Sequence, residues 1–72
     1  MRFDGQALLR AREANGLTQE QLAAASGSTF STISRLERGL TEPTLTTITK
    51  IAKALDVPVA TLLADEKDGA AA

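Results

Sequence analysis

The sequence predicts an all-α protein: one compact domain of five helices and no strands. Three observations support this prediction. The chain has 72 residues, enough for a single domain that buries about 60% of its unfolded surface. Hydrophobic residues make up 43% of the chain and aromatic residues 3%, so the core must be aliphatic, which suits packed helices better than a sheet. The apolar residues also recur at helical spacing.

The first two helices are predicted from their start and stop signals. The first is expected over residues 5–15, after Asp4 as its N-cap and up to the Asn15-Gly16 pair, a combination that commonly ends helices. The second is expected over residues 18–26. It opens on a capping box, in which Thr18 accepts a hydrogen bond from the backbone of Gln21 and the Gln21 side chain reaches back.

Three more helices follow along the chain. Thr29 caps the third, which is expected over residues 29–38 and ends at a glycine. Thr44 caps the fourth, which is expected over residues 45–55 and has a regular apolar face. A proline, which is favoured at a first helical position, opens a short fifth helix over residues 58–64.

Charge divides the chain into a folded part and a tail. Residues 1–64 are expected to form one domain, and residues 65–72 a flexible, acidic and alanine-rich tail. The net charge is −1, but residues 1–64 carry seven basic and six acidic groups. Because this part is only weakly basic, any binding of DNA must depend on where the charges lie rather than on a large field.

Missing residue types exclude several function classes. The chain has no cysteine or histidine, which excludes disulfides, thiolate or imidazole metal sites, and Cys/His or Ser/His catalysis. It also lacks a glycine-rich phosphate loop and a convergent set of carboxylates. No enzyme, metal or cofactor is therefore expected. No apolar run reaches the roughly 18 residues of a membrane span and no secretory signal is evident, so we expect a cytoplasmic protein outside the membrane.

The two central helices are joined more tightly than an ordinary helical hairpin requires. In a 20-residue unit that begins at Gln19, Ala23 is fifth, Gly27 ninth, Ile33 fifteenth and Leu36 eighteenth. The alanine must be small because the next helix crosses over it, and the glycine allows a positive φ at the turn. Ile33 and Leu36 anchor the second helix and leave its other side free to enter a groove. This is the pattern of a helix-turn-helix.

With these residues, the sequence resembles the Cro/C1-type, or XRE, helix-turn-helix family of bacterial and phage repressors. The resemblance covers about Leu8 to Leu63, in the segments ALLRAREANGLTQEQLA, GSTFSTISRLERG, EPTLTTITKIAKAL and LL. It implies a five-helix, lambda-repressor-like domain whose third helix enters the DNA major groove, usually as a dimer on a palindromic operator. Ser26 and Ser28 depart from the family pattern, which often has apolar residues beside the turn glycine.

The resemblance also implies two sets of DNA contacts. The expected base-contacting residues are Thr29, Phe30, Ser31, Ser34 and Arg35. The expected phosphate-contacting residues are Thr18, Gln19, Arg38, Thr41 and Thr44. The planar fork of Arg35 suits guanine, although a phosphate contact or a solvated side chain is the alternative. The Phe30 ring either packs on a thymine methyl group or fills the core. Thr18 and Gln19 either contact phosphate as well as capping their helix or only cap it.

Two structural roles complete the resemblance. Arg12 and Glu37 match a pair that forms a partly buried salt bridge in many members of the family, and the alternative is two independently solvated charges. On the fifth helix, Val59, Leu62 and Leu63 match a region that often forms a dimer contact. Core packing alone is the alternative for these three residues.

Two functions from different classes follow. The first is a DNA-binding transcriptional regulator, a homodimeric repressor that recognises a palindromic double-stranded operator in a sequence-specific way. The second is a protein-interaction module or antitoxin-type protein that binds a partner such as a toxin and has weak or no independent affinity for DNA. The near-neutral charge and Phe30 suit the second function.

Overall fold

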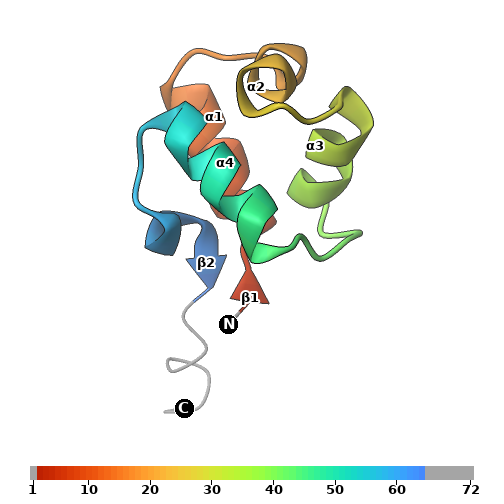
Figure 1. Ribbon diagram of the computed structural model, residues 1–72, viewed down its shortest axis with the longest axis vertical. Coiled ribbons are helices and arrows are strands. Elements are labelled where there is room, and N and C mark those ends of the chain that lie inside the picture. The colour runs from red at the N-terminus through yellow and green to blue at the C-terminus, as the bar shows by residue number, and fades with distance from the viewer. Residues whose placement is uncertain (1, 65–72) are drawn as a thin grey trace.

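The computed structural model describes residues 2–64, which form a helical domain with a small strand pair at one end (Figure 1). The expected tail, residues 65–72, lies outside the described residues. In chain order the elements are β1 (Arg2–Phe3), α1 (Gly5–Ala14), α2 (Gln19–Ser26), α3 (Phe30–Glu37), α4 (Leu45–Leu55), the 3-10 helix η1 (Val59–Leu62) and β2 (Leu63–Ala64). The first four predicted helices are therefore present, each within about one residue of its expected ends.

The predicted N-caps all make their hydrogen bonds. Asp4 accepts from the backbone N–H groups of Gln6 and Ala7 at the start of α1. Both halves of the capping box form at α2, with the Thr18 hydroxyl and the Gln21 side chain each accepting from the other residue's backbone. The Thr29 and Thr44 hydroxyls cap α3 and α4 by accepting from the backbone N–H groups of Thr32 and Thr47. These local contacts satisfy N–H groups that a helix leaves without partners.

The fifth predicted helix is wrong in kind and length. Residues 58–64 form a four-residue 3-10 helix followed by β2, which pairs antiparallel with β1 through Arg2–Ala64 and Phe3–Leu63. The expectation that the chain has no strands is therefore wrong as well. A helix of seven residues is marginal by itself. Pairing with β1, together with a 2.8 Å hydrogen bond from Asp4 N to Leu62 O, gives this backbone partners that local periodicity does not reveal.

The core is aliphatic, as the composition predicts. Every helical element contributes to one cluster of buried side chains, which consists of Leu8, Leu22, Ala23, Ile33, Leu36, Ile48, Ile51, Ala52, Leu55 and Leu62. Helix α2 contacts both α3 and α4, and α1 contacts α3. This packing supports α3 from behind, so that the helix lies at the edge of the domain in Figure 1. None of the helices between residues 2 and 64 is long and apolar enough to cross a membrane.

The turn between α2 and α3 has the predicted conformation. Gly27 adopts a left-handed conformation with a φ of 71°, and Ala23 is buried where α3 packs on α2. The departure from the family pattern at Ser26 is accommodated by a hydrogen bond. Its buried hydroxyl donates to Leu22 O at 2.8 Å, which satisfies the polar group without an external partner.

Candidate nucleic-acid interface

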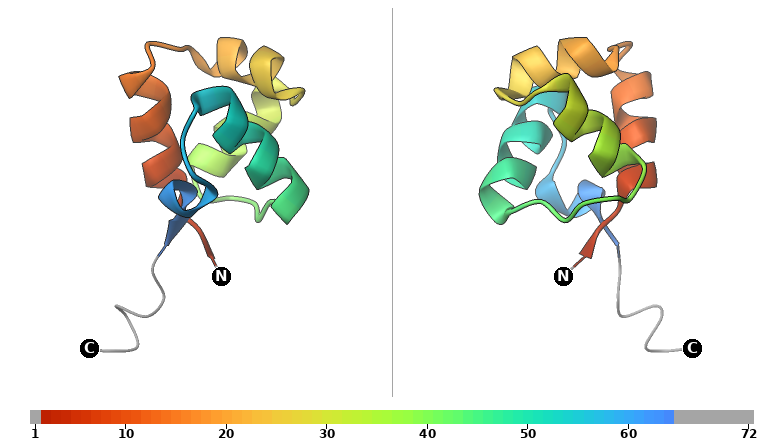
Figure 2. Two further views of the ribbon diagram at one scale, coloured as in Figure 1. Left: turned by 60° about the vertical axis from the view of Figure 1, so that its left-hand side comes forward. Right: turned by 90° about the vertical axis from the view of Figure 1, so that its right-hand side faces the viewer.

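Helix α3 has one buried side and one open side. Ile33, Leu36 and Glu37 face the domain and are buried. Ser31 and Arg35 are exposed on the other side, and Ser34 is half-buried between them. In the right-hand view of Figure 2, α3 crosses the front of the domain with no other element over it. The side chains expected to read bases therefore lie where a ligand can reach them.

The Phe30 ring is not part of the core. It is 50% exposed at the first turn of α3 and lies outside the hydrophobic cluster around Ile33. The alternative in which this ring fills the core is therefore wrong. An exposed aromatic ring beside Ser31 is placed to make an apolar contact with a ligand, such as the methyl group of thymine.

The Thr29 hydroxyl is already engaged. It accepts a hydrogen bond from Thr32 N at 3.1 Å and donates its proton to Thr32 Oγ1 at 3.0 Å. A base contact that uses this proton would have to replace the bond between the two side chains. Thr29 is consequently a poorer base-reading residue than Ser31 and Arg35, which extend from the exposed side of the helix.

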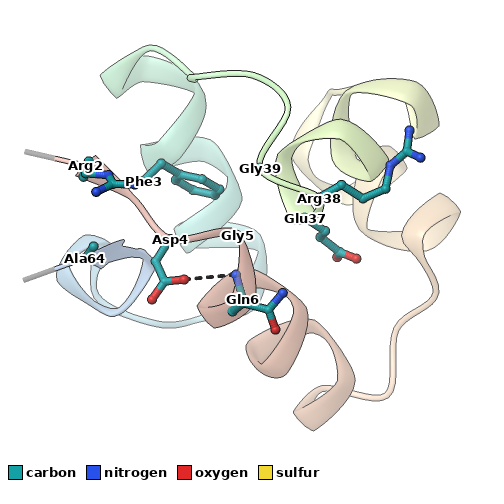
Figure 3. Close-up of a pocket in the computed structure, with 9 residues that line it drawn as sticks. All are labelled: Arg2, Phe3, Asp4, Gly5, Gln6, Glu37, Arg38, Gly39 and Ala64. Atoms are coloured by element: carbon teal, nitrogen blue, oxygen red, sulfur yellow. Dashed lines mark hydrogen bonds between the residues drawn. The ribbon is translucent and has the colours of Figure 1, made fainter.

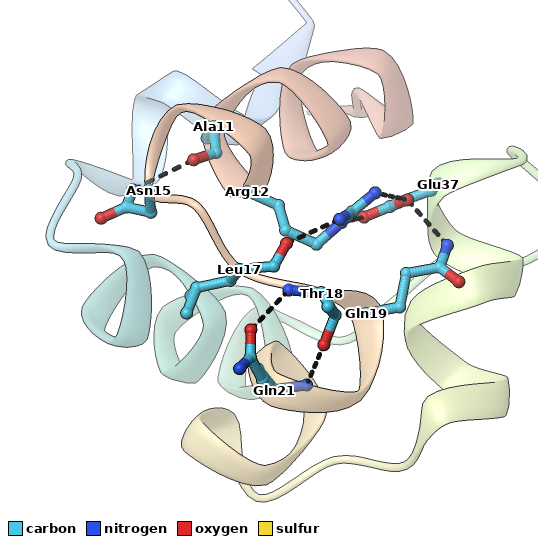
Figure 4. Close-up of polar contacts among 8 residues, drawn as sticks. All are labelled: Ala11, Arg12, Asn15, Leu17, Thr18, Gln19, Gln21 and Glu37. Atoms are coloured by element: carbon cyan, nitrogen blue, oxygen red, sulfur yellow. Dashed lines mark hydrogen bonds and ion pairs between the residues drawn. The ribbon is translucent and has the colours of Figure 1, made fainter.

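The predicted ion pair joins α1 to α3. Arg12 Nε donates to Glu37 Oε2 at 2.6 Å and Arg12 Nη2 to Glu37 Oε1 at 3.2 Å. The two side chains are 12% and 4% exposed, which rules out two independently solvated charges. The hydrogen bond to Glu37 raises the pKa of Arg12 even though burial opposes it. Arg12 also donates to Leu17 O at 2.7 Å, and therefore holds the segment that leads into α2 as well (Figure 4).

The start of α2 contributes two further polar groups. The Thr18 hydroxyl accepts from Gln21 N at 3.0 Å, and its own proton has no acceptor among residues 2–64. Gln19 is half-buried, and its Nε2 donates to Glu37 Oε1 at 2.9 Å (Figure 4). Sequence reasoning missed this contact. No local signal reveals it, because the two residues are 18 positions apart.

The segment between α3 and α4 contributes two threonines. Thr41 is exposed. Thr44 caps α4 and shares a 3.1 Å hydrogen bond with the hydroxyl of Thr47. Between them, Glu42 Oε2 accepts from Phe3 N at 3.2 Å. This carboxylate, which a phosphate would repel, is therefore tied to β1.

The expected dimer surface must be corrected at Leu62. This side chain is fully buried in the monomer, in contact with the aliphatic core. Val59 and Leu63 are half-buried and pack against the same core. Within residues 2–64, the large apolar side chains that are exposed are Phe30, Leu40 and Leu45. The side chains of Val59, Leu62 and Leu63 thus serve the monomer first, because a domain this small needs them to complete its core.

One pocket opens beside β1, between the start of α1 and the end of α3 (Figure 3). Its lining consists of Arg2, Phe3, Asp4, Gly5, Gln6, Glu37, Arg38, Gly39 and Ala64. The charged ends of Arg2, Asp4 and Arg38 point in different directions in Figure 3 rather than toward one point. This arrangement does not resemble a site for a small charged ligand, which needs converging polar groups.

Comparison with known proteins agrees with this geometry. A family model described as helix-turn-helix matches residues 8–62. The HTH-type transcriptional regulator y4dL of Sinorhizobium fredii, itself uncharacterised, is 46% identical over 54 residues, which are 75% of this chain and 28% of that protein. This chain thus spans less than a third of that relative.

Several solved structures share the fold, among them a controller protein and a master regulator. The restriction-modification controller protein C.AhdI from Aeromonas hydrophila is 42% identical, with a TM-score of 0.80 over 82% of this chain and 89% of that one. SinR, a Bacillus subtilis protein described as the master regulator for biofilm formation, has been solved in complex with DNA. In that complex SinR is 36% identical to this chain, with a TM-score of 0.77 over 81% of this chain and 94% of that one.

Proposed function

The chain belongs to the Cro/C1-type helix-turn-helix family of transcriptional regulators, and on that premise we propose that it is a repressor that binds a specific double-stranded DNA operator through α3. The observation that carries the proposal is the two-sided α3. Its inner side is buried and held by the Arg12–Glu37 ion pair, and its outer side presents Ser31 and Arg35 to solvent. A helix held in this way can enter a major groove as a rigid unit.

Separate groups carry base and phosphate contacts in this proposal. Arg35 donates to guanine O6 and N7, the Ser31 and Ser34 hydroxyls bind base edges directly or through water, and the Phe30 ring contacts a thymine methyl group. The groups assigned to phosphate lie at the start of α2, at the C-terminal end of α3, in the segment that follows α3 and at the start of α4. They are Thr18, Gln19, Arg38, Thr41 and Thr44.

The low charge of the domain favours binding as a homodimer on a palindrome. If each subunit makes about three or four phosphate contacts, log K for the dimer should fall with log salt concentration with a slope of roughly −6. Val59 and Leu63 remain as proposed contacts between subunits, without Leu62. Such a regulator acts in the cytoplasm on the DNA it controls.

Selecting bound sites from random DNA, followed by an electrophoretic shift at low salt with competitor, tests the proposal. We expect a palindromic site and a competitor-resistant band. The absence of a competitor-resistant band at micromolar protein would refute sequence-specific DNA binding and favour the protein-interaction function.

Arg35→Ala and Arg38→Ala form a matched pair for the readout of bases. Arg35→Ala should abolish the preference for guanine at one position of each half-site, a loss of about 10- to 100-fold in discrimination. Arg38→Ala should instead weaken binding to all sequences alike and make the salt slope shallower by about one unit per subunit. Uniform weakening by Arg35→Ala would show that Arg35 is a phosphate ligand.

A further inference from the structure

The Glu37 carboxylate receives hydrogen bonds from two helices at once. Its Oε2 accepts from Arg12 Nε at 2.6 Å. Its Oε1 accepts from both Arg12 Nη2 at 3.2 Å and Gln19 Nε2 at 2.9 Å (Figure 4). The Glu37 side chain is 4% exposed, so these donors take the place of water around a buried charge. The hydrogen bonds to Glu37 therefore connect three helices: α1 through Arg12, α3 through Glu37 itself, and the first residue of α2 through Gln19.

This contact determines which way the Gln19 amide faces. An ionised carboxylate can only accept hydrogen bonds, so the nitrogen of the amide must be the atom that faces Glu37. An amide nitrogen carries two protons. One is used on Glu37 Oε1, and Nε2 has no second partner among residues 2–64. The half-buried side chain thus has a defined orientation and one N–H still free to donate.

The position of Gln19 gives that remaining N–H a use. Gln19 is the first residue of α2, where backbone N–H groups without helical partners and the positive end of the helix dipole attract anions. A glutamine that ordered itself only on binding would lose side-chain entropy at that moment, and this loss would weaken the complex. Because Arg12 neutralises Glu37, the carboxylate can hold the amide without presenting a net negative charge to a phosphate.

We propose that Glu37 is a positioning residue for DNA binding: its buried carboxylate orients the Gln19 amide before DNA arrives, so that the second Nε2 proton donates to a backbone phosphate. The inference rests on the proposed DNA-binding function and adds a residue that never touches DNA. It links the ion pair that stabilises the fold to the affinity for the operator.

The test compares Gln19→Ala in two backgrounds. One is the wild-type chain, and the other carries Arg12→Met with Glu37→Met, which replaces the buried pair by apolar side chains of similar size and tends to preserve stability. Affinity for the selected operator is measured by fluorescence anisotropy at a temperature where urea unfolding shows every variant to be folded. In the wild-type background, loss of a hydrogen bond to a charged phosphate should weaken binding about tenfold or more.

In the background without the ion pair, Gln19→Ala should weaken binding less than about threefold, because the amide is no longer oriented before binding. Gln21→Ala is the matched control. It removes the 2.8 Å hydrogen bond that Gln21 Oε1 accepts from Thr18 N at the N-cap of α2 and does not involve Glu37, so its effect should be the same in both backgrounds. Equal effects of Gln19→Ala in the two backgrounds, or no effect in the wild-type chain, would overturn the inference.

A measurement on the wild-type protein covers the case in which the variant with two methionines does not fold. In the free protein, one Nε2 proton of Gln19 should exchange with water more slowly than those of the exposed Gln6, and the other should shift only when DNA is added. Equally fast exchange at both side chains would refute the orientation by Glu37. If the wild-type chain binds no operator at all, the proposed function fails. If the wild-type chain binds the operator, but Gln19→Ala has equal effects in both backgrounds or the Gln19 amide protons exchange as fast as those of Gln6, only the positioning role of Glu37 is wrong.

Discussion

Arg12→Ala should destabilise the fold strongly because of what it leaves behind. Glu37 would be left as a carboxyl group without its cation, at a site where its side chain is 4% exposed and the Gln19 amide is its remaining donor. Leu17 O would also lose its 2.7 Å hydrogen bond. Removing one partner of a buried ion pair costs about 3–5 kcal/mol. A chain of this length has roughly 4–11 kcal/mol of stability in total, so the loss is a large part of it.

Urea unfolding followed by circular dichroism measures this loss directly. We expect the midpoint to fall sharply with little change in slope, and a loss of 3 kcal/mol to lower Tm by roughly 12–24 °C. Arg10→Ala is the matched control, because Arg10 lies on the same helix with an exposed side chain. Its effect should stay within about 0.5 kcal/mol. DNA affinity should fall with Arg12→Ala as well, since α3 loses its tie to α1.

Replacing both partners distinguishes two contributions to the free energy of unfolding: the cost of an unpaired buried group and the contribution of the ion pair itself. Arg12→Met combined with Glu37→Met should be far more stable than Arg12→Ala, within about 1–2 kcal/mol of the wild type, because no unpaired charge remains in the interior. If Arg12→Ala and Arg10→Ala have the same unfolding midpoint, the ion pair does not support the fold and the reasoning is refuted.

Three further substitutions test the packing. Gly5→Ala should lower the free energy of unfolding by about 2–3 kcal/mol, because an added Cβ would lie 2.3 Å from the backbone oxygen of Leu36. A melting temperature that matches the wild type would contradict this contact. In Gly27→Ala the added Cβ meets no atom within 4 Å, but the residue must keep a φ of 71°. Urea titration should therefore give a smaller loss of about 1–2 kcal/mol. A loss equal to or larger than that of Gly5→Ala would contradict this difference between the two glycines. Leu62→Ala should cost about 2–5 kcal/mol in the same titration, whereas a stable variant with altered sedimentation would assign Leu62 to a dimer contact after all.

The candidate site could be predicted to different degrees in its parts. The open side of α3 follows from the spacing of Ile33 and Leu36, because burying those two side chains turns Ser31 and Arg35 outward. The Arg12–Glu37 pair came from the family resemblance, since nothing local links residues 25 positions apart. The position of the Phe30 ring does not follow from the sequence, because an aromatic residue at the first turn of α3 can either pack inward or lie 50% exposed, as it does.

The sequence by itself determined the first four helices, their caps and the turn at Gly27, because each depends on contacts between residues a few positions apart. Only the tertiary structure decided the end of the chain. Whether residues 58–64 form a helix depends on Arg2–Phe3, some 60 residues away, which pair with β2 and leave Leu62 in the core. The same holds for the Glu37 hydrogen bond to Gln19, because only the packing of α3 against α2 brings a carboxylate and an amide 18 positions apart within 2.9 Å.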